Sequence, residues 1–102
     1  MNKIKVMVKE PHKKPNMVEL DNTLESLQKT VEGRIETVRI APDLTIICDE
    51  EGLLKDKRFN CTVTGIQLFG TIIFVGVKDD EFADLPISEE EFKFAFSNLY
   101  RK

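Results

Sequence analysis

The sequence predicts one α+β domain over residues 1–102, in which a mostly antiparallel sheet of five to six strands packs against two helices. The chain is long enough for one domain and too short for two. Short β-branched segments alternate with turn residues, and two segments space their apolar residues as amphipathic helices do. The expected order is β-β-α-β-β-β-β-α, with both helices on one face of the sheet. An open sheet and a partly closed barrel both fit this order.

The first two strands are expected to form a hairpin. Residues 3–9 alternate between apolar side chains and mostly basic ones, which predicts a half-buried strand with a basic outer face. Pro11 and Pro15 place a long loop after this strand, and residues 17–20 return as its partner.

An amphipathic helix is expected to follow this hairpin. Residues 24–31 carry leucine and valine at positions i, i+3 and i+7, which is the spacing of one helical face. Asn22 and Glu25 resemble a capping box at the start of this helix, and Gly33 is placed to end it.

The middle of the chain reads as a series of strands. Residues 34–41 and 44–48 are β-branched segments joined by the turn residues Pro42 and Asp43, which predicts a second hairpin. Four large apolar residues in succession at 72–75 indicate a central strand that is covered on both faces. Further strands are expected at residues 61–64, 66–69 and 71–77.

An acidic loop at residues 79–85 leads to the last helix. Ser88 and Glu91 have the spacing of a capping box. Phe94 lies about 200° around a helix from Phe92, so it either is exposed or packs under a loop. The expected buried stripe consists of Phe92, Ala95, Phe96 and Leu99.

The composition favours a soluble globular protein, because 41% of the residues are hydrophobic and 32% are charged. The N-terminus lacks the apolar core of a signal peptide, so we expect a cytoplasmic protein that does not contact membranes. Cys48 and Cys61 lie in apolar segments and are expected to be buried free thiols. With His12 as the single histidine and no Cys-x-x-Cys spacing, we expect no metal and no cofactor.

The sequence offers no recognisable catalytic residue. None of its three serines lies in a Gly-x-Ser-x-Gly turn, and its glycines are not spaced as a phosphate-binding loop requires. His12 can pair with a cysteine only if the fold brings them together. Adjacent carboxylates on turns usually diverge, and the acidic loop at 79–84 is the best remaining cation site. We therefore expect no enzyme activity; an enzyme of unrecognised type is the least favoured alternative.

Charge is distributed unevenly along the chain. Residues 1–16 hold five lysines and one acid, a net charge of +4, whereas residues 17–102 hold ten basic and seventeen acidic residues, a net charge of -7. The basic hairpin predicts phosphate contacts to nucleic acid, although it lacks interleaved aromatic residues. The other interpretation is an edge strand whose lysines prevent aggregation. The five lysines are Lys3, Lys5, Lys9, Lys13 and Lys14.

Several blocks of sequence together carry a family resemblance. They are Glu10-Pro11, residues 24–28, Gly33 with Ile35-Glu36, residues 44–52, residues 70–76 and residues 80–82. On these blocks the chain resembles the bacterial domain-of-unknown-function family 3846, found mainly on phages, plasmids and conjugative elements. The stretch at residues 57–60 is shorter than in members of that family. The resemblance implies an accessory protein of a mobile element in the bacterial cytoplasm, and it implies no reaction.

These observations favour a small non-enzymatic protein-interaction or regulatory module. Its partner would be another protein or a second copy of the chain, bound through the last helix and the acidic loop. The alternative is a weak nucleic-acid binder that uses the basic hairpin. The expected protein-binding residues are Phe94, Tyr100, Asp79, Asp80 and Glu81.

Overall fold

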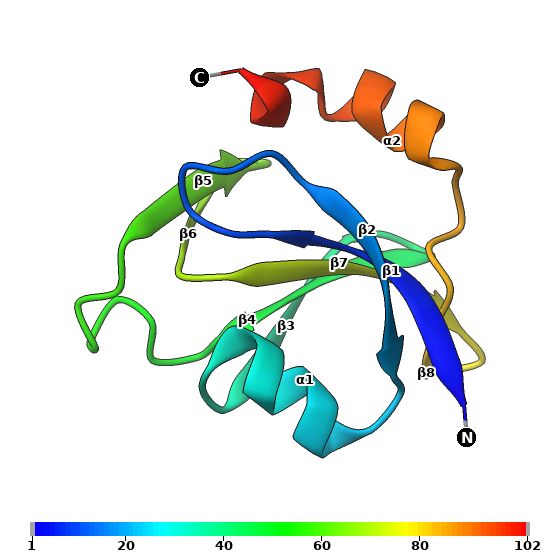
Figure 1. The fold of residues 1–102 in the computed structure, drawn as a ribbon, viewed down its shortest axis with the longest axis horizontal. Coiled ribbons are helices and arrows are strands. Elements are labelled where there is room, and N and C mark those ends of the chain that lie inside the picture. The colour runs from blue at the N-terminus through cyan, green and yellow to red at the C-terminus, as the bar shows by residue number, and fades with distance from the viewer. Residues whose placement is uncertain (1, 102) are drawn as a thin grey trace.

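A computed structural model of the chain describes residues 2–101, which form eight strands, two α-helices and one 3₁₀-helix (Figure 1). The elements are β1 (Lys3–Lys9), β2 (Asn16–Asp21), α1 (Leu24–Val31), β3 (Ile35–Ala41), β4 (Leu44–Asp49), β5 (Phe59–Val63), β6 (Ile66–Phe69), β7 (Ile72–Lys78), β8 (Glu81–Ala83), α2 (Glu89–Ala95) and η1 (Ser97–Tyr100). The expected α+β class and the order of the main elements are confirmed. The additions are β8 and η1.

The main sheet has six strands, and its principal path runs β2-β1-β7-β4-β3. All of its pairings are antiparallel. As expected, β7 is central, and Ile72, Ile73, Phe74 and Val75 are fully buried. Strands β5 and β6 form a separate two-stranded hairpin.

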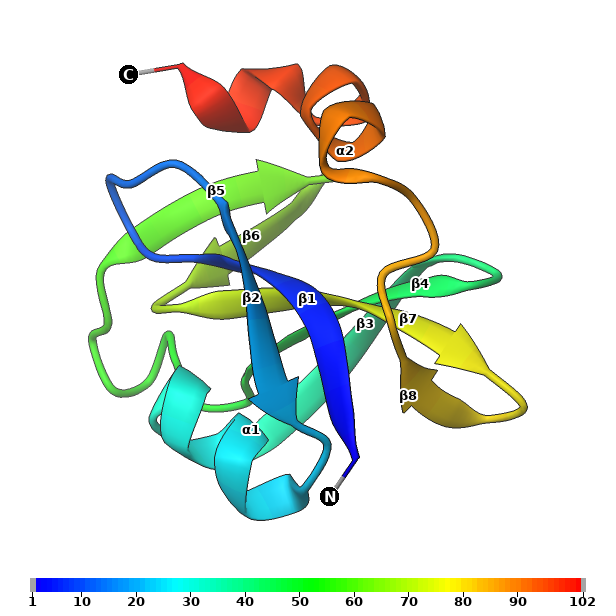
Figure 2. The ribbon, with the colours of Figure 1, turned by 45° about the vertical axis from the view of Figure 1, so that its right-hand side comes forward.

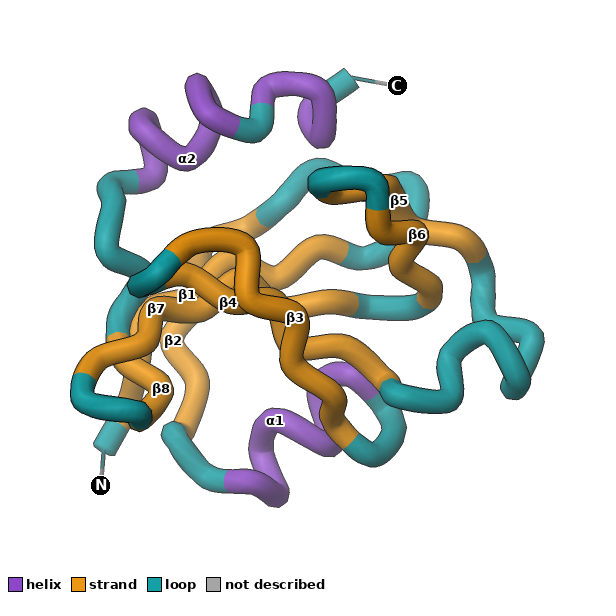
Figure 3. Tube along the Cα trace, turned by 180° about the vertical axis from the view of Figure 1, so that it is seen from behind, coloured by secondary structure: helices purple, strands orange, loops and turns teal. Residues whose placement is uncertain are grey.

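The helices lie on opposite faces of the main sheet, which corrects the expectation that they share one face (Figures 1 and 2). Leu27 and Val31 of α1 pack in one cluster with Ile73. Phe92 of α2 packs in a second cluster with Phe74 and with the β5–β6 hairpin. Successive residues of β7 point to opposite faces, so a run of apolar residues supplies both clusters. The view from behind shows α1 and α2 separated by the strands (Figure 3).

Strand β1 is an interior strand, because it pairs with β2 on one side and β7 on the other. The interpretation of its lysines as an edge-strand device is therefore wrong. Near its end both faces are covered, because the consecutive residues Val6 and Met7 point to opposite faces and are both fully buried. Lys9 shares the face of Met7 and is 5% exposed. The cationic side chain of Lys9 is therefore buried on the face of the sheet that α2 covers.

The predicted acidic loop contains β8, which pairs antiparallel with β7, and the residues that follow β8 bond to β1. The Leu85 N–H donates to the Lys5 carbonyl at 2.8 Å, and the Lys5 N–H donates to Asp84 Oδ1 at 2.8 Å. A Cβ at Gly76 would meet the Asp84 carbonyl, so glycine lets this segment approach β7 closely. Strand β8 has only three residues and follows an acidic turn, so the sequence pattern was too short to predict it.

The helix caps agree with the sequence at α2 and differ at α1. Ser88 Oγ accepts from the Glu91 N–H at 3.1 Å while Glu91 Oε1 accepts from the Ser88 N–H at 2.8 Å, which confirms the capping box. At α1 the cap is Thr23, whose Oγ1 accepts from the Ser26 N–H at 3.1 Å. Glu32, with φ of 61°, is the left-handed residue that ends this helix, a role expected of Gly33.

Neither helix in the described part of the chain has the length and apolar character needed to cross a membrane.

Candidate functional site

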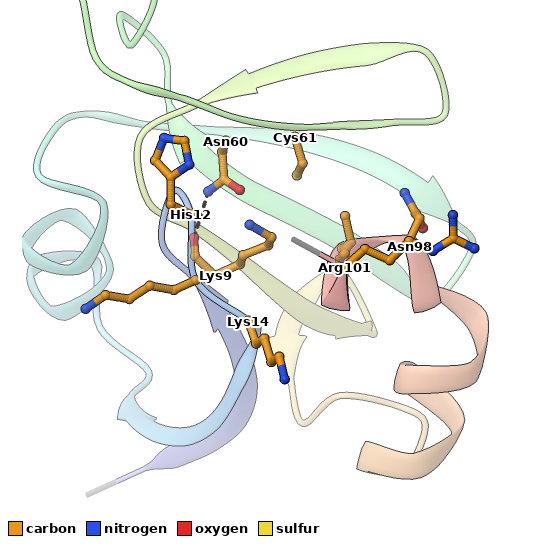
Figure 4. Close-up of a pocket in the computed structure, with 9 residues that line it drawn as sticks. Lys9, His12, Lys14, Asn60, Cys61, Asn98 and Arg101 are labelled. Carbon is orange, nitrogen blue, oxygen red and sulfur yellow. Dashed lines mark hydrogen bonds between the residues drawn. The ribbon is translucent and has the colours of Figure 1, made fainter.

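A basin of about 510 Å³ opens between the loop after β1 and the C-terminal 3₁₀-helix η1 (Figure 4). Its wall is polar and basic, and none of the described residues that line it is acidic. The ionisable nitrogen groups that line it belong to Lys9, His12, Lys13, Lys14 and Arg101. Such a concentration of cations without carboxylates favours an anionic ligand.

Lys9 is the enclosed cation of this basin. It is the last residue of β1, and its side chain reaches into the space between the β1–β2 loop and the C-terminal segment (Figure 4). Its Nζ donates to the Glu10 carbonyl at 3.3 Å, and within residues 2–101 it has no carboxylate at ion-pair distance. Burial lowers the pKa of Lys9, although the neighbouring Cys61 acts in the opposite direction. A buried ammonium without a countercharge is costly, and a bound anion would offset that cost.

Asn60, in β5, links the floor of the basin to the end of β1 and to the turn between β6 and β7. Its Nδ2 donates to the Lys9 carbonyl at 2.8 Å and to the Gly70 carbonyl at 2.7 Å, which fixes the orientation of the amide. Its Oδ1 is buried and has no hydrogen-bond partner among the described residues. The basin therefore contains two unpaired buried groups among the described residues: Asn60 Oδ1, an acceptor without a donor, and the Lys9 ammonium, a cation without a carboxylate.

The rim of the basin is formed by exposed side chains from both ends of the chain. A tight turn, closed by the Lys13 N–H donating to the Glu10 carbonyl at 3.2 Å, presents His12 with a left-handed φ of 64°. Lys13 Nζ lies 3.7 Å from Glu10 Oε1, a solvent-exposed pair of small energetic value. Lys14 and Arg101 are exposed, so they remain accessible to a ligand at the mouth of the basin.

His12 and Cys61 both line the basin, whereas a cysteine–histidine pair requires the two side chains to lie within hydrogen-bond reach of each other. Asn60 lies between them in the view of Figure 4. Burial raises the pKa of the Cys61 thiol, and the opposing effect of Lys9 does not cancel this increase. A nucleophilic cysteine needs a lowered pKa, so this environment disfavours a thiolate. Both cysteines are buried and free, as expected.

The five N-terminal lysines do not form one surface. Lys9, Lys13 and Lys14 line the basin. Lys3 lies near the other end of β1, where its Nζ is 3.3 Å from Asp21 Oδ1, and Lys5 is exposed on the same part of the strand. The lysines are divided because Lys9 ends β1 beside the basin, whereas Lys3 and Lys5 lie near the start of the same strand, outside the basin.

The basin also contains residues that the sequence did not single out as site residues. Asn60 comes from β5, and Asn98 and Arg101 come from the C-terminal segment. No motif marks them, because they meet the β1–β2 loop only in the folded chain. Arg101 follows the predicted last helix, and a basic residue there is already explained by its favourable interaction with the helix dipole. Its position in the sequence therefore did not indicate a binding site.

The expected protein-binding residues also separate in the structure. Phe94 is 88% exposed, so it does not pack under a loop. Tyr100 is half-buried and packs against the cluster around Phe74. Asp79, Asp80 and Glu81 lie at the β7–β8 turn, away from α2 in both ribbon views (Figures 1 and 2). The last helix and the acidic turn therefore do not form one continuous surface.

A second cluster of charged residues has a structural role. The side chain of Asp49 is fully buried and accepts hydrogen bonds from Lys55 Nζ at 2.9 Å and from the Glu51 N–H at 3.0 Å, and it forms an ion pair with Lys57 Nζ at 2.8 Å. Burial alone would raise the pKa of Asp49, but these three contacts outweigh it and lower the pKa to about 2. Lys57 Nζ also donates to the Val31 carbonyl at 2.7 Å, at the C-terminus of α1.

Metal binding finds no support in the described part of the chain, where no three histidine, cysteine, aspartate or glutamate side chains are grouped to hold an ion. The acidic segment at 79–84 is divided between a turn, β8 and Asp84, whose carboxylate is engaged by the Lys5 N–H. The cation site considered for this segment is therefore not assembled.

Comparisons with known proteins give one match. No curated protein and no solved structure matches the chain. The family model described as "Domain of unknown function (DUF3846)" matches residues 4–97. The match covers the sheet, both helices and most of the residues that line the basin, and the chain belongs to this family.

Proposed function

We propose that this protein is a non-enzymatic binding module that binds nucleic acid through phosphate groups held at the basic basin. The observation that carries the proposal is the enclosure of Lys9, an almost fully buried cation without an acidic partner among residues 2–101, in a cavity that Lys13, Lys14 and Arg101 also line. Phosphate oxygens are strong acceptors for lysine and arginine, and they are the commonest contacts of nucleic-acid-binding proteins.

The charge distribution supports binding at this one place. The chain carries a net charge of -3, so most of its surface repels a polyanion. Lys9, Lys13, Lys14 and Arg101 concentrate positive charge around the basin. No phenylalanine, tyrosine or tryptophan is among the described residues that line it, so binding would depend mainly on phosphates and not on base stacking.

A binding role accounts for the basin better than catalysis does. Lysines and asparagines dominate its wall, and the raised pKa of Cys61 makes its thiol a poor nucleophile. The resemblance to proteins of phages, plasmids and conjugative elements supports a role as an accessory protein of a mobile element, acting in the bacterial cytoplasm.

Binding is tested by fluorescence anisotropy with labelled single-stranded DNA and RNA of random sequence. We expect affinity to fall at least tenfold between ~50 mM and ~200 mM salt, because phosphate binding releases counterions. The double variant Lys13→Glu/Lys14→Glu is expected to abolish binding at both salt concentrations.

The matched control is Lys3→Glu/Lys5→Glu, which changes the same number of charges on the same hairpin outside the basin. We expect it to retain most of the affinity. Binding that is insensitive to salt, or an equal loss in the two double variants, would contradict the proposal.

A protein interface at α2 is the second candidate, and the 88% exposure of Phe94 is the observation that favours it. Large aromatic side chains are common anchors in protein interfaces. The partner would be a second copy of the chain or another protein. We expect the wild type to self-associate in a sedimentation concentration series and Phe94→Ser to remain monomeric. Identical sedimentation of the wild type and Phe94→Ser would contradict self-association through Phe94.

A further inference from the structure

We propose that the basic basin is a phosphomonoester site, which takes the terminal phosphate of a nucleic-acid strand in preference to the phosphodiesters along it. This inference rests on the proposed function and names the group that the site recognises. The same chemistry is present in a free mononucleotide, so the experiment below distinguishes the two sources.

The balance of charge favours a monoester. Three lysines and one arginine line the basin, and the Glu10 carboxylate pairs only with Lys13, from 3.7 Å in a solvent-exposed pair. A phosphodiester carries one negative charge, whereas a phosphomonoester carries between 1.5 and 2 at neutral pH, about the same as a phosphorylated side chain. The monoester therefore neutralises more of the charge held around Lys9.

The depth of the basin also favours a strand end. Lys9 is 5% exposed, whereas Lys13, Lys14 and Arg101 stand exposed at the rim. An internal phosphate continues into a nucleotide on both sides, so it can cross the rim but reaches an enclosed ammonium poorly. A terminal phosphate has one covalent connection and can enter with its free oxygens directed at Lys9.

Asn60 supplies the hydrogen-bonding evidence. Both of its amide hydrogens donate to the Lys9 and Gly70 carbonyls, which fixes the orientation of the amide and leaves the buried Oδ1 as an acceptor without a donor among the described residues. The monoanion of a phosphomonoester can donate its O–H to this oxygen while its other oxygens accept from Lys9. The dianion lacks this proton and gains the greater charge neutralisation instead, since the second pKa is about 6. Phosphodiesters and sulfate carry no such proton. The site is therefore expected to discriminate phosphate from sulfate, and terminal from internal phosphates.

The test compares single strands of one sequence that end in a phosphate or a hydroxyl, with the fluorescent label at the opposite end. Both 5′- and 3′-phosphorylated strands are used. We expect a phosphorylated strand to bind about tenfold more tightly than its hydroxyl counterpart, the size of effect of one charge-assisted hydrogen bond. Inorganic phosphate and nucleoside 5′-monophosphate should compete with it, and sulfate at equal ionic strength should compete at least several-fold less well.

Lys9→Met is the variant that isolates the enclosed cation, because methionine keeps the apolar stem and removes the charge. We expect it to erase the difference between phosphorylated and hydroxyl strands. Lys5→Met is its matched control, since it makes the same change on the same strand outside the basin, and it should preserve the difference. Thermal unfolding of both variants verifies that they are folded.

Each outcome separates this inference from the proposed function. Equal, salt-dependent binding of phosphorylated and hydroxyl strands overturns the phosphomonoester site and leaves nucleic-acid binding intact. Binding of free nucleoside monophosphate without binding of any strand supports the phosphomonoester site and overturns the nucleic-acid function. Absence of binding by every probe overturns both. Competition by sulfate as strong as that by phosphate overturns the role of Asn60.

Discussion

Asp49 is a buried carboxylate that forms ion pairs with two lysines. Its carboxylate joins β4 to the β4–β5 loop through Lys55 and Lys57, and Lys57 in turn reaches the C-terminal carbonyls of α1. Removal of one member of a buried ion pair leaves the other unpaired, which costs more than the pair itself contributes. This contact network therefore stabilises the packing of α1 on the sheet.

Acid is expected to destabilise the protein through Asp49. Its pKa is about 2 in the folded state and near 3.8 in the unfolded chain, so its contribution is complete above the unfolded value and is lost as the pH falls through the folded one. The difference corresponds to about 2 kcal/mol of unfolding free energy, lost between about pH 5 and about pH 2.

Urea denaturation of the wild type and Asp49→Asn across this pH range measures that contribution. The variant is expected to be less stable at neutral pH, by about 3 kcal/mol, and to lose less stability in acid. Parallel pH profiles for the two proteins would show that Asp49 does not carry the effect.

Gly33 is required by the same carboxylate. A Cβ at this position would overlap the Asp49 side chain, which is held in place by its three partners. Gly33→Ala is therefore expected to lower the free energy of unfolding by about 2 kcal/mol, as overpacking does at a rigid site. Denaturation of Gly33→Ala in an Asp49→Ala background should show a much smaller effect, and an undiminished effect there would contradict the contact.

At the scale of the element, α2 presents two phenylalanines with opposite environments. Phe92 is fully buried and its ring centroid lies 4.9 Å from that of Phe74, whereas Phe94 is 88% exposed. Phe92→Ala is expected to cost about 3–5 kcal/mol of unfolding free energy, and Phe94→Ala less than about 0.5 kcal/mol. Urea denaturation measures both values. Comparable losses in the two variants would show that Phe94 packs against the domain.

Strand β7 unites the two hydrophobic clusters at the scale of the whole molecule. Ile73 and Val75 belong to the α1 side, and Ile72 and Phe74 belong to the α2 side. Because one strand supplies both clusters, loss of either is expected to disrupt the other. The domain should therefore unfold in a single cooperative transition.

Two optical signals test this cooperativity. Tyr100 is the single tyrosine in a chain without tryptophan, so its fluorescence reports on the α2 side, while far-UV circular dichroism reports on all strands and helices. The two urea transitions are expected to coincide. A fluorescence change that precedes the dichroism change would show that α2 and η1 detach on their own.

Local sequence patterns were sufficient for most of the secondary structure. The β3–β4 hairpin, the central β7 and the Ser88 capping box were predicted correctly, since each depends on neighbours along the chain. Strand β1 was also placed correctly, but Met7 and Lys9, which were expected on its basic outer face, are buried. The α1 cap was assigned one residue too early, because Asn22 and Thr23 are both suitable caps. Lys9, Lys13 and Lys14 were recognised as basic residues, but the burial of Lys9 was not.

The sequence by itself determined the α+β class, the order of the main elements and the segregation of charge, because these follow from local periodicity and composition. The tertiary structure decided which face each helix covers, and it made β1 an interior strand. It also brought Asn60 and Arg101 to the β1–β2 loop and enclosed Lys9 between them. Such contacts join residues far apart in the chain, and no local pattern encodes them.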